Sequence, residues 1–295
     1  MSLRSIRTDR WTAWHALGAA FMAALGVAAM YPAWADMYVI AYNDEEYSHI
    51  FLVPLVALWM VWVRRLRFRH CRVTGTGLGL VIAGLGWAIS AYGFYHGHQS
   101  LWHGGAVLVV VGCIVTVLGK QLLFRFFPAV AVLVFLVPVP GMIRQQIAIP
   151  LQTWTAQISQ VVLEVMGVPV ERSVNQLRVN GIPVNIIEAC NGLRMVWPLI
   201  LMSYAFSFGL PLRNSVRFLV LAASPLAAIF CNVVRILPTI WLYSHYIKPE
   251  DKRIPDLFHD YSGWLMLPIA FLILLGLIKT LRWAMIPVMR YTLAS

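Results

Sequence analysis

Long apolar segments recur along nearly the whole 295-residue chain, and basic residues cluster in the short segments between them. A helix of about 20 apolar residues is long enough to cross the hydrocarbon core of a bilayer. Because 60% of the residues are hydrophobic and only 12% are charged, the composition excludes a soluble globular domain. The sequence therefore predicts an all-α polytopic membrane protein.

We expect about eight transmembrane helices in a single integral membrane domain that covers residues 1–295. The expected spans cover residues 11–31, 48–63, 75–95, 101–118, 126–137, 191–208, 218–243 and 261–278. The fifth span ends at the helix-breaking sequence Pro138-Val139-Pro140-Gly141. Residues 33–46 form an acidic segment after the first span. A second acidic segment precedes the last span and is expected to be an exposed loop carrying Glu250, Asp251, Asp256, His259 and Asp260.

Residues of about 141–189, before the sixth span, do not read as a simple span. Apolar side chains recur at helical spacing and polar ones occupy the opposite face, which is typical of a helix that lies on the membrane surface or docks against the bundle. The apolar set is Ile147, Leu151, Trp154, Ile158, Val161 and Val165, and the polar set is Gln146, Thr153, Gln157, Gln160 and Glu164. Residues 177–179 and 182–184 then predict a short β-hairpin around Asn180-Gly181.

The distribution of charge predicts how the chain is oriented. With the N-terminus inside, 15 of the 23 Lys and Arg residues lie on cytoplasmic segments, together with only Asp9 of the 12 acidic residues. The net charge of +11 is therefore explained by topology, and we expect no nucleic-acid partner. Both termini are expected to be cytoplasmic, which places the surface helix, the hairpin, Cys190 and His259 on the outer side.

Three residues of different helices could perform chemistry on that side. Cys190 begins the sixth span with Arg194 one helical turn later, so helix dipole and guanidinium both favour a thiolate, although a cysteine in such a place can also be buried and inert. Arg235 lies inside the seventh span, where an arginine costs at least ~2.5 kcal/mol. It is either functional, or it snorkels outward or satisfies the carbonyls of a neighbour. His259 opens the eighth span and is either an acid/base group or simply solvated.

Together these residue types suit cysteine acyl transfer. A nucleophile needs a group that creates its charged form, and an oxyanion needs a donor that stabilises it. Cys190, His259 and Arg235 can fill the roles of nucleophile, acid/base and electrophilic clamp. No CxxC or CxxH spacing is present, so we expect neither a metal nor a cofactor.

The chain also resembles a known family, the exosortases of the exosortase/archaeosortase group of membrane cysteine transpeptidases. The resemblance rests on three blocks: Glu188-Ala189-Cys190-Asn191-Gly192-Leu193-Arg194, Asn232-Val233-Val234-Arg235-Ile236, and the His259 segment with Gly263. Glu46-Tyr47-Ser48-His49 with Phe51-Leu52-Val53-Pro54, and Val137-Pro138-Val139-Pro140, resemble further family blocks. Ile50 stands where glycine is expected and Asn191 where serine is common, which bears on the subfamily.

The resemblance implies an enzyme that cleaves a C-terminal sorting signal on the outer face of the bacterial inner membrane. Such a signal consists of a short Pro-Glu-Pro-like motif, a transmembrane helix and a basic tail. Cys190 would form a thioester, His259 would shuttle the proton, and Arg235 would stabilise the oxyanion or the thiolate. Arg194, Asn232 and Glu188 are expected to bind substrate. The implied partners are exported proteins that carry the signal, membrane lipid and an unknown acceptor nucleophile, with the active site in the periplasm and a link to exopolysaccharide production.

Two other functions remain open on the sequence. A transporter or scaffold for exopolysaccharide assembly would use Arg235 and Asn232 to line a path, and Cys190 would be incidental. A metal-dependent membrane hydrolase would draw on the six histidines expected outside, but no HExxH motif supports it. Those histidines are His49, His96, His98, His103, His245 and His259. The surface helix and hairpin could cap the active site and hold an extended motif by strand addition, or serve only as a membrane-seated plug.

Overall fold

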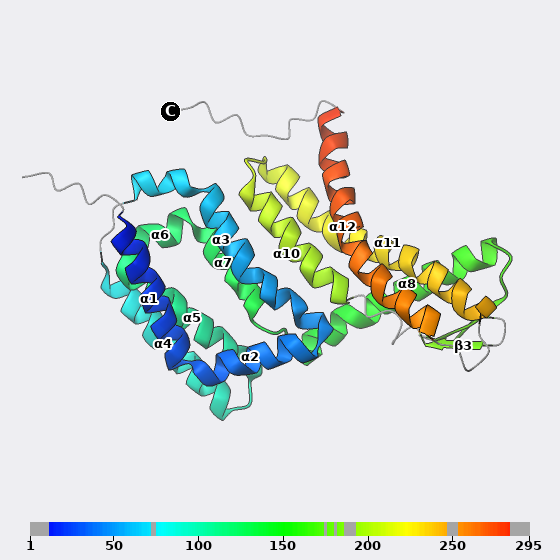
Figure 1. Ribbon diagram of the computed structural model, residues 1–295, viewed down its shortest axis with the longest axis horizontal. Helices are drawn as coiled ribbons and strands as arrows, with labels where there is room; N and C mark the ends of the chain where they lie inside the picture. Colours follow the sequence, from blue (N-terminus) through cyan, green and yellow to red (C-terminus); the bar gives the residue numbers. More distant parts are fainter. Residues whose placement is uncertain are drawn as a thin grey trace, which may run out of the picture. The chain divides into compact units, whose positions relative to one another are not determined.

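Helices make up most of the part of the chain that the structure, a computed structural model, describes (Figure 1). The description covers residues 12–71, 75–173, 176–179, 182–185, 193–246 and 253–283, without the side chains of residues 45, 69–70, 172–195, 236, 239–260 and several of 262–282. Two compact units divide the chain, Met1–Pro140 and Gly141–Ser295.

The first unit consists of helices that follow one another with short connections. They are α1 (Ala13–Ala29), α2 (Tyr31–Asn43), η1 (Glu45–Leu52), α3 (Val53–Val63), η2 (Arg65–His70), α4 (Gly77–Tyr95), α5 (Gln99–Leu118), α6 (Lys120–Arg125), α7 (Phe127–Ala131) and η3 (Val132–Leu136). The expected fifth span corresponds to α7 and η3, and its regular structure ends before Pro138, as the two prolines require.

Helix α1 lies within the expected first span, and the structure differs from the expectation in the segment that follows it. The chain bends by 85° between α1 and α2, and α2 continues as a helix to Asn43 through the segment that the sequence marked only as acidic. Pro32 occupies the first turn of α2, where its missing N–H would have no helical partner in any case, so the proline starts a helix here instead of ending one.

Glycines explain the close packing of α4 against α5. Gly79, Gly86 and Gly93 follow at intervals of seven residues on α4, and Gly105 and Gly112 do so on α5. A Cβ atom added at Gly86 would lie 2.8 Å from the carbonyl oxygen of Gly105, closer than real Cβ atoms come. Small residues let the two backbones touch, which is how helices associate where no hydrophobic effect drives them together.

In the residues that the structure describes, the second unit combines four helices with a small sheet. Its elements are α8 (Gly141–Val165), β1 (Val170–Ser173), β2 (Gln176–Val179), β3 (Ile182–Asn185), α10 (Leu193–Gly209), α11 (Asn214–Tyr246) and α12 (Arg253–Trp283). Helices α10, α11 and α12 share a core of buried residues, against which Leu151 of α8 packs. These buried residues are Val196, Leu199, Ala227, Ala228, Cys231, Ala270 and Leu274.

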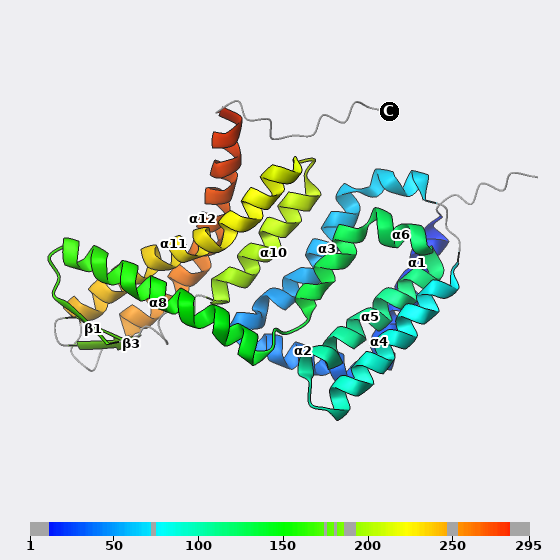
Figure 2. The same ribbon diagram turned by 180° about the vertical axis from the view of Figure 1, so that it is seen from behind.

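The sheet lies against α8 and has the antiparallel order β1-β2-β3 (Figure 2). Strands β2 and β3 pair Leu177 with Val184 and Val179 with Ile182, at the positions where the sequence predicts two strands. The connecting Asn180-Gly181 lies outside the described residues. Strand β1, which pairs Val170 with Val179, was not expected.

The number of spans in the described residues is lower than the eight expected. Four helices are long and apolar enough to cross a membrane, or up to six if each of two bent helix pairs counts as one span. The shorter apolar helices Val196–Gly209 and Pro268–Leu281 correspond to the expected sixth and eighth spans. The predicted class, a polytopic helical membrane protein, agrees with this arrangement.

The start of the last helix corrects another prediction. Helix α12 begins at Arg253, so Asp256, His259 and Asp260 lie on a helix and not in an exposed loop. Pro255 falls in the first turn, where a proline is tolerated, and Asp256 follows near the positive end of the helix dipole. Both features start a helix about two turns before the apolar run that was used to locate it.

Candidate active site

The most unusual side chain of the second unit is Arg235 of α11. Only 2% of it is exposed, and it is the largest fully buried side chain among the described residues. Burial of a guanidinium is unfavourable unless hydrogen bonds and dipoles replace the lost water. Polar groups must therefore surround the guanidinium of Arg235, although the other buried residues of this helix are mainly small or aliphatic.

Two buried polar side chains form a hydrogen-bonded series with this arginine. Nη2 of Arg235 donates to Oδ1 of Asn232 at 3.1 Å, and Nδ2 of Asn232 donates to Oγ1 of Thr155 at 3.4 Å. Asn232 and Arg235 lie three residues apart on one face of α11, whereas Thr155 belongs to α8. The series thus connects two helices and orients the guanidinium.

The backbone beside Arg235 is also altered. Pro238 lies inside α11 and has no N–H, so the carbonyl of Val234 receives no helical hydrogen bond from the residue four positions later. This leaves a backbone acceptor next to the buried cation. A proline-interrupted helix and a buried arginine at the same place are typical of a functional segment within a membrane.

Helix α8 docks through a face that the sequence did not single out. Its buried residues are Thr155, Ala156, Ser159 and Leu163, whereas most of the predicted apolar face points outward. Exposed members of that face are Trp154, Ile158, Val161 and Val165. A helix with small residues inside and large apolar residues outside suits a membrane-facing element, because lipid can cover the large side chains. The hydroxyl of Thr155, and with it the contact to Asn232, was missed because a single polar residue gives no periodic signal.

The remaining predicted site residues can be placed only by their position in the chain. Cys190 and Glu188 lie outside the described residues. Helix α10 starts at Leu193, three residues after Cys190, and Arg194 follows in its first turn. His259 lies on α12 and its side chain is outside the description. Of the six predicted site residues, the structure thus brings together Arg235 and Asn232.

Cysteines in the described residues do not resemble nucleophiles. Cys231 is buried in the core of α10, α11 and α12, and Cys113 is partly buried. The buried thiol of Cys71, between η2 and α4, donates to the carbonyl of Arg67 at 3.4 Å. Burial raises the pKa of the Cys71 thiol, and the nearby guanidinium of Arg125 opposes this only in part.

Four of the six histidines considered as metal ligands have described side chains, and they lie in three separate settings. Nδ1 of His49 donates to the carbonyl of Glu46 at 3.0 Å, and Nε2 of His103 pairs with Asp36 at 2.9 Å. His96 and His98 lie near the ring of Tyr92. Within the part of the chain that the structure describes, no three His, Cys, Asp or Glu residues are grouped so that they could hold a metal ion.

Two motifs far apart in the sequence meet in the first unit. The hydroxyl of Tyr47 donates to the carbonyl of Val139 at 3.3 Å, and the hydroxyl of Ser100 donates to the carbonyl of Pro138 at 2.8 Å. Prolines have no N–H with which to form a regular ladder, so side-chain donors hold this segment instead. Both motifs therefore belong to the framework of that unit.

The chain is similar to a known protein family. Residues 34–276 match the family model described as transmembrane exosortase, and this range includes all six predicted site residues. No curated protein and no solved structure matches the chain.

Proposed function

The chain belongs to the transmembrane exosortase family, and from this membership we propose that it is a cysteine protease or transpeptidase embedded in the membrane. Its substrates are exported proteins that end in a sorting signal: a Pro-Glu-Pro-like motif, a transmembrane helix and a basic tail. The enzyme cleaves at the motif on the outer face of the bacterial inner membrane and passes the substrate to an acceptor nucleophile. The acceptor is either a second molecule or water.

The observation that carries the proposal is the buried Arg235. A cation held inside an apolar helix by Asn232, beside a backbone carbonyl that has no helical N–H donor because of Pro238, costs stability and has to be explained by function. Electrostatic stabilisation of developing negative charge is strongest where water is excluded and the donor is already oriented. Both conditions apply to this guanidinium.

In the proposed reaction the thiolate of Cys190 attacks the scissile carbonyl carbon, whose oxygen becomes an oxyanion near Arg235. Protonated His259 gives its proton to the leaving amine as the carbon–nitrogen bond breaks, and a thioester remains on Cys190. The acceptor then attacks the thioester, and its proton passes to His259. The carbon–sulfur bond breaks, which releases the thiolate of Cys190. Arg194 and Glu188 bind the substrate, and Asn232 both orients Arg235 and contacts the sorting motif.

The second unit suggests how an extended motif is held. We assign α8 and the sheet to a cap over the active site, with α8 fixed through Thr155 and the sheet providing strands beside which a peptide can lie. Both termini lie in the cytoplasm and the reaction takes place in the periplasm.

The test is co-expression with a tagged protein that carries such a signal. Wild type is compared with Cys190→Ala, and Cys113→Ala serves as the matched control because it removes a thiol from the other unit. Membrane levels are equalised by immunoblot, and the intact mass of the substrate is measured. We expect the wild type and Cys113→Ala to remove the C-terminal helix, and Cys190→Ala to leave it in place.

The mass of the new C-terminus identifies the acceptor: a free carboxylate indicates hydrolysis and a larger mass indicates transfer. Conversion by Cys190→Ala at the wild-type rate would exclude Cys190 as the nucleophile. The chain would then be better described as a transporter or scaffold, in which Arg235 lines a path.

A further inference from the structure

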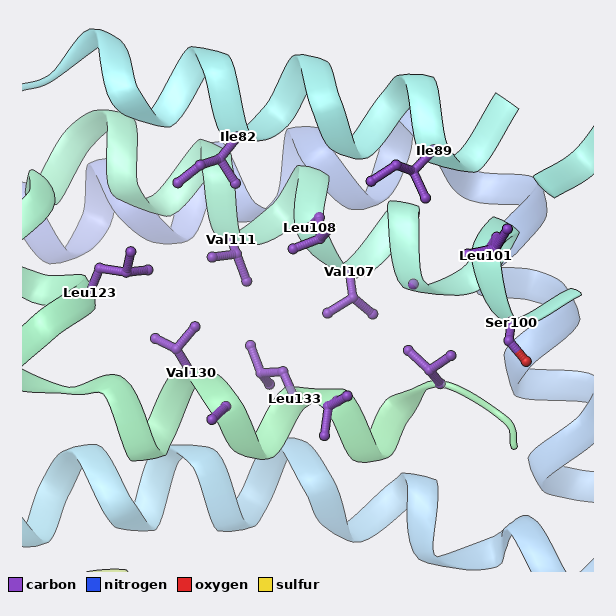
Figure 3. Close-up of a pocket in the computed structure, with 14 residues that line it drawn as sticks. Ile82, Ile89, Ser100, Leu101, Val107, Leu108, Val111, Leu123, Val130 and Leu133 are labelled. Atoms are coloured by element: carbon purple, nitrogen blue, oxygen red, sulfur yellow. The ribbon is translucent and has the colours of Figure 1, made fainter. Parts of the chain in front are cut away.

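A cleft of about 550 Å³ runs through the first unit between α4 and α5 on one side and α7 with η3 on the other (Figure 3). In Figure 3 Val107, Leu108 and Val111 face Val130 and Leu133 across it. Leu123 lies at one end and Ser100 at the other. Thirteen of the 14 lining residues have no polar side-chain atom, and the one hydroxyl, of Ser100, already donates to Pro138.

The shape and chemistry of this cleft suit a hydrocarbon chain. It follows α5, one of the four candidate spans, over Ser100 to Val111, which is about 17 Å at the rise of an α-helix. Its side is open, since Val134 is 64% exposed and Leu108 is 38% exposed. A polar ligand would find no hydrogen-bond partners here, whereas an acyl chain from the surrounding bilayer loses nothing on entering.

Basic side chains gather at the Leu123 end of the cleft. Nη1 of Arg67 donates to the carbonyl of Arg125 at 3.0 Å, and the rings of Phe68 and Phe126 stack at 4.4 Å, so η2 packs beside α6. Arg65, Arg67, Lys120 and Arg125 are all exposed there. The sequence has no Asp or Glu between residues 47 and 163, so no acidic residue of this long segment offsets these charges.

We propose that the cleft binds an acyl chain of an anionic phospholipid, whose phosphate is held at the Leu123 end by Arg67 and Arg125. Guanidinium groups bind phosphate oxygens through paired hydrogen bonds, and two exposed arginines on packed neighbouring segments favour an anionic headgroup over a zwitterionic one. The positive-inside rule puts this end in the cytoplasmic leaflet. The lipid fills the space between α5 and η3 and so supports the Pro138–Val139 segment to which Ser100 and Tyr47 are bonded.

Binding is measured on the purified full-length chain by native mass spectrometry during titration with dioleoyl phosphatidylglycerol or dioleoyl phosphatidylcholine. Wild type should bind its first phosphatidylglycerol at least tenfold more tightly than phosphatidylcholine. Glycerol phosphate, which has the anionic group without acyl chains, should not compete. Equal affinity for the two lipids, or competition by glycerol phosphate, would overturn the proposal.

Two sets of variants separate the chain site from the headgroup site. Gly104→Leu fills the cleft, because a Cβ atom at Gly104 meets only the methyl groups of Val137 at 3.8 and 4.0 Å, and Gly84→Leu is its control, with open space around it. Gly104→Leu should weaken the binding of the first lipid at least tenfold for both headgroups, and Gly84→Leu should not. Val134→Trp, which covers the open side, should give the same loss and keeps the test valid if Gly104→Leu fails to fold.

The double variant Arg67→Gln with Arg125→Gln should lose the preference for phosphatidylglycerol and keep the affinity for phosphatidylcholine. Arg213→Gln, an exposed arginine of the other unit, is the control and should bind as wild type does. Two results would show that lipid does not occupy this cleft. One is a preference for phosphatidylglycerol that survives in the double variant. The other is lipid affinity of Gly104→Leu and Val134→Trp equal to that of Gly84→Leu.

Discussion

Arg235 illustrates how a single buried charge can be supported by residues of two helices. Its guanidinium is oriented by Asn232, which is itself held by Thr155 of α8. A chain of this kind acts as a unit, because the loss of one member leaves the next without its partner. The position of Arg235 therefore depends on a hydroxyl that is 80 residues away in the sequence.

Replacement of Thr155 by valine tests this dependence. Thr155→Val keeps the shape of the side chain and removes the acceptor for Nδ2 of Asn232, so we expect the free energy of unfolding to fall by about 1–3 kcal/mol. Thr155→Ser should lower the free energy of unfolding by less than half as much. Thr153→Val is the control, since that hydroxyl only donates to Ile149 of its own helix, and it should have almost no effect. Denaturation in detergent gives all three values, and equal losses for the two valine variants would contradict the role of Thr155.

Thiol reactivity provides a second prediction for individual residues. Burial raises the pKa of Cys71, so little thiolate exists near pH 7 and its alkylation by iodoacetamide should be slow and should accelerate as the pH rises. Arg125→Gln removes the charge that opposes this effect and should slow the reaction further. Cys190, if it is the nucleophile, should react fastest near neutral pH. Peptide mass spectrometry measures each rate, and a Cys71 that reacts as fast as Cys190 at pH 7 would refute the prediction.

At the level of elements, the α4–α5 pair depends on backbone contact. Gly86→Ala introduces a Cβ atom 2.8 Å from the carbonyl oxygen of Gly105, and neither backbone can move aside as a side chain could. We expect a loss of about 1–3 kcal/mol, the usual cost of overpacking. Gly84→Ala, on the same helix with nothing within 4 Å, should be neutral or slightly stabilising because alanine favours helix more than glycine does. Thermal melts of the two purified variants measure this difference in stability, and similar melting temperatures would rule out close packing at Gly86.

Elements with a strong local signal could be predicted from the sequence. Prolines predict the end of regular structure before Pro138. Apolar runs predict the approximate bounds of α10 and α11, and an Asn-Gly pair predicts the positions of β2 and β3. Helix α2 and the start of α12 could not, because their acidic residues indicate exposed segments, although each helix has a proline in its first turn, where proline is favourable. The docking face of α8 was hidden for another reason. In a membrane the largest apolar residues need not face the protein, so the amphipathic pattern does not identify the buried side.

The candidate site was predictable in part. Arg235 and Asn232 were identified because polar residues inside an apolar run are rare, and both are buried and bonded to each other. Thr155 lies on another helix, and its contact with Asn232 depends on how α8 packs against α11. Packing of this kind is a tertiary property that spacing within one helix does not contain. The roles of Cys190, His259, Arg194 and Glu188 remain predictions.

Charge is distributed unevenly over the whole molecule. The segment from residue 47 to residue 163 has no acidic residue, and its arginines and lysine near η2 and α6 lie on the side that the positive-inside rule assigns to the cytoplasm. The same rule places the turn between α4 and α5 outside. We therefore predict that a few cations next to short helices set the orientation in the membrane, because each of them resists transfer across the bilayer.

Reporter fusions test this orientation. Alkaline phosphatase fused after Gly97, in the turn between α4 and α5, should be active because it folds only in the periplasm, and a fusion after Gly119, between α5 and α6, should be inactive. A cytoplasmic reporter should show the opposite pattern at the two sites. Replacement of Arg64, Arg65 and Arg67 by glutamine removes three of the five arginines in residues 64–72 that favour a cytoplasmic η2, so the Gly119 fusion should gain phosphatase activity while that of the Gly97 fusion falls. If the Gly119 fusion is active in the wild-type background, the orientation is reversed, and both the periplasmic active site and the cytoplasmic headgroup site would have to be exchanged between the two sides of the membrane.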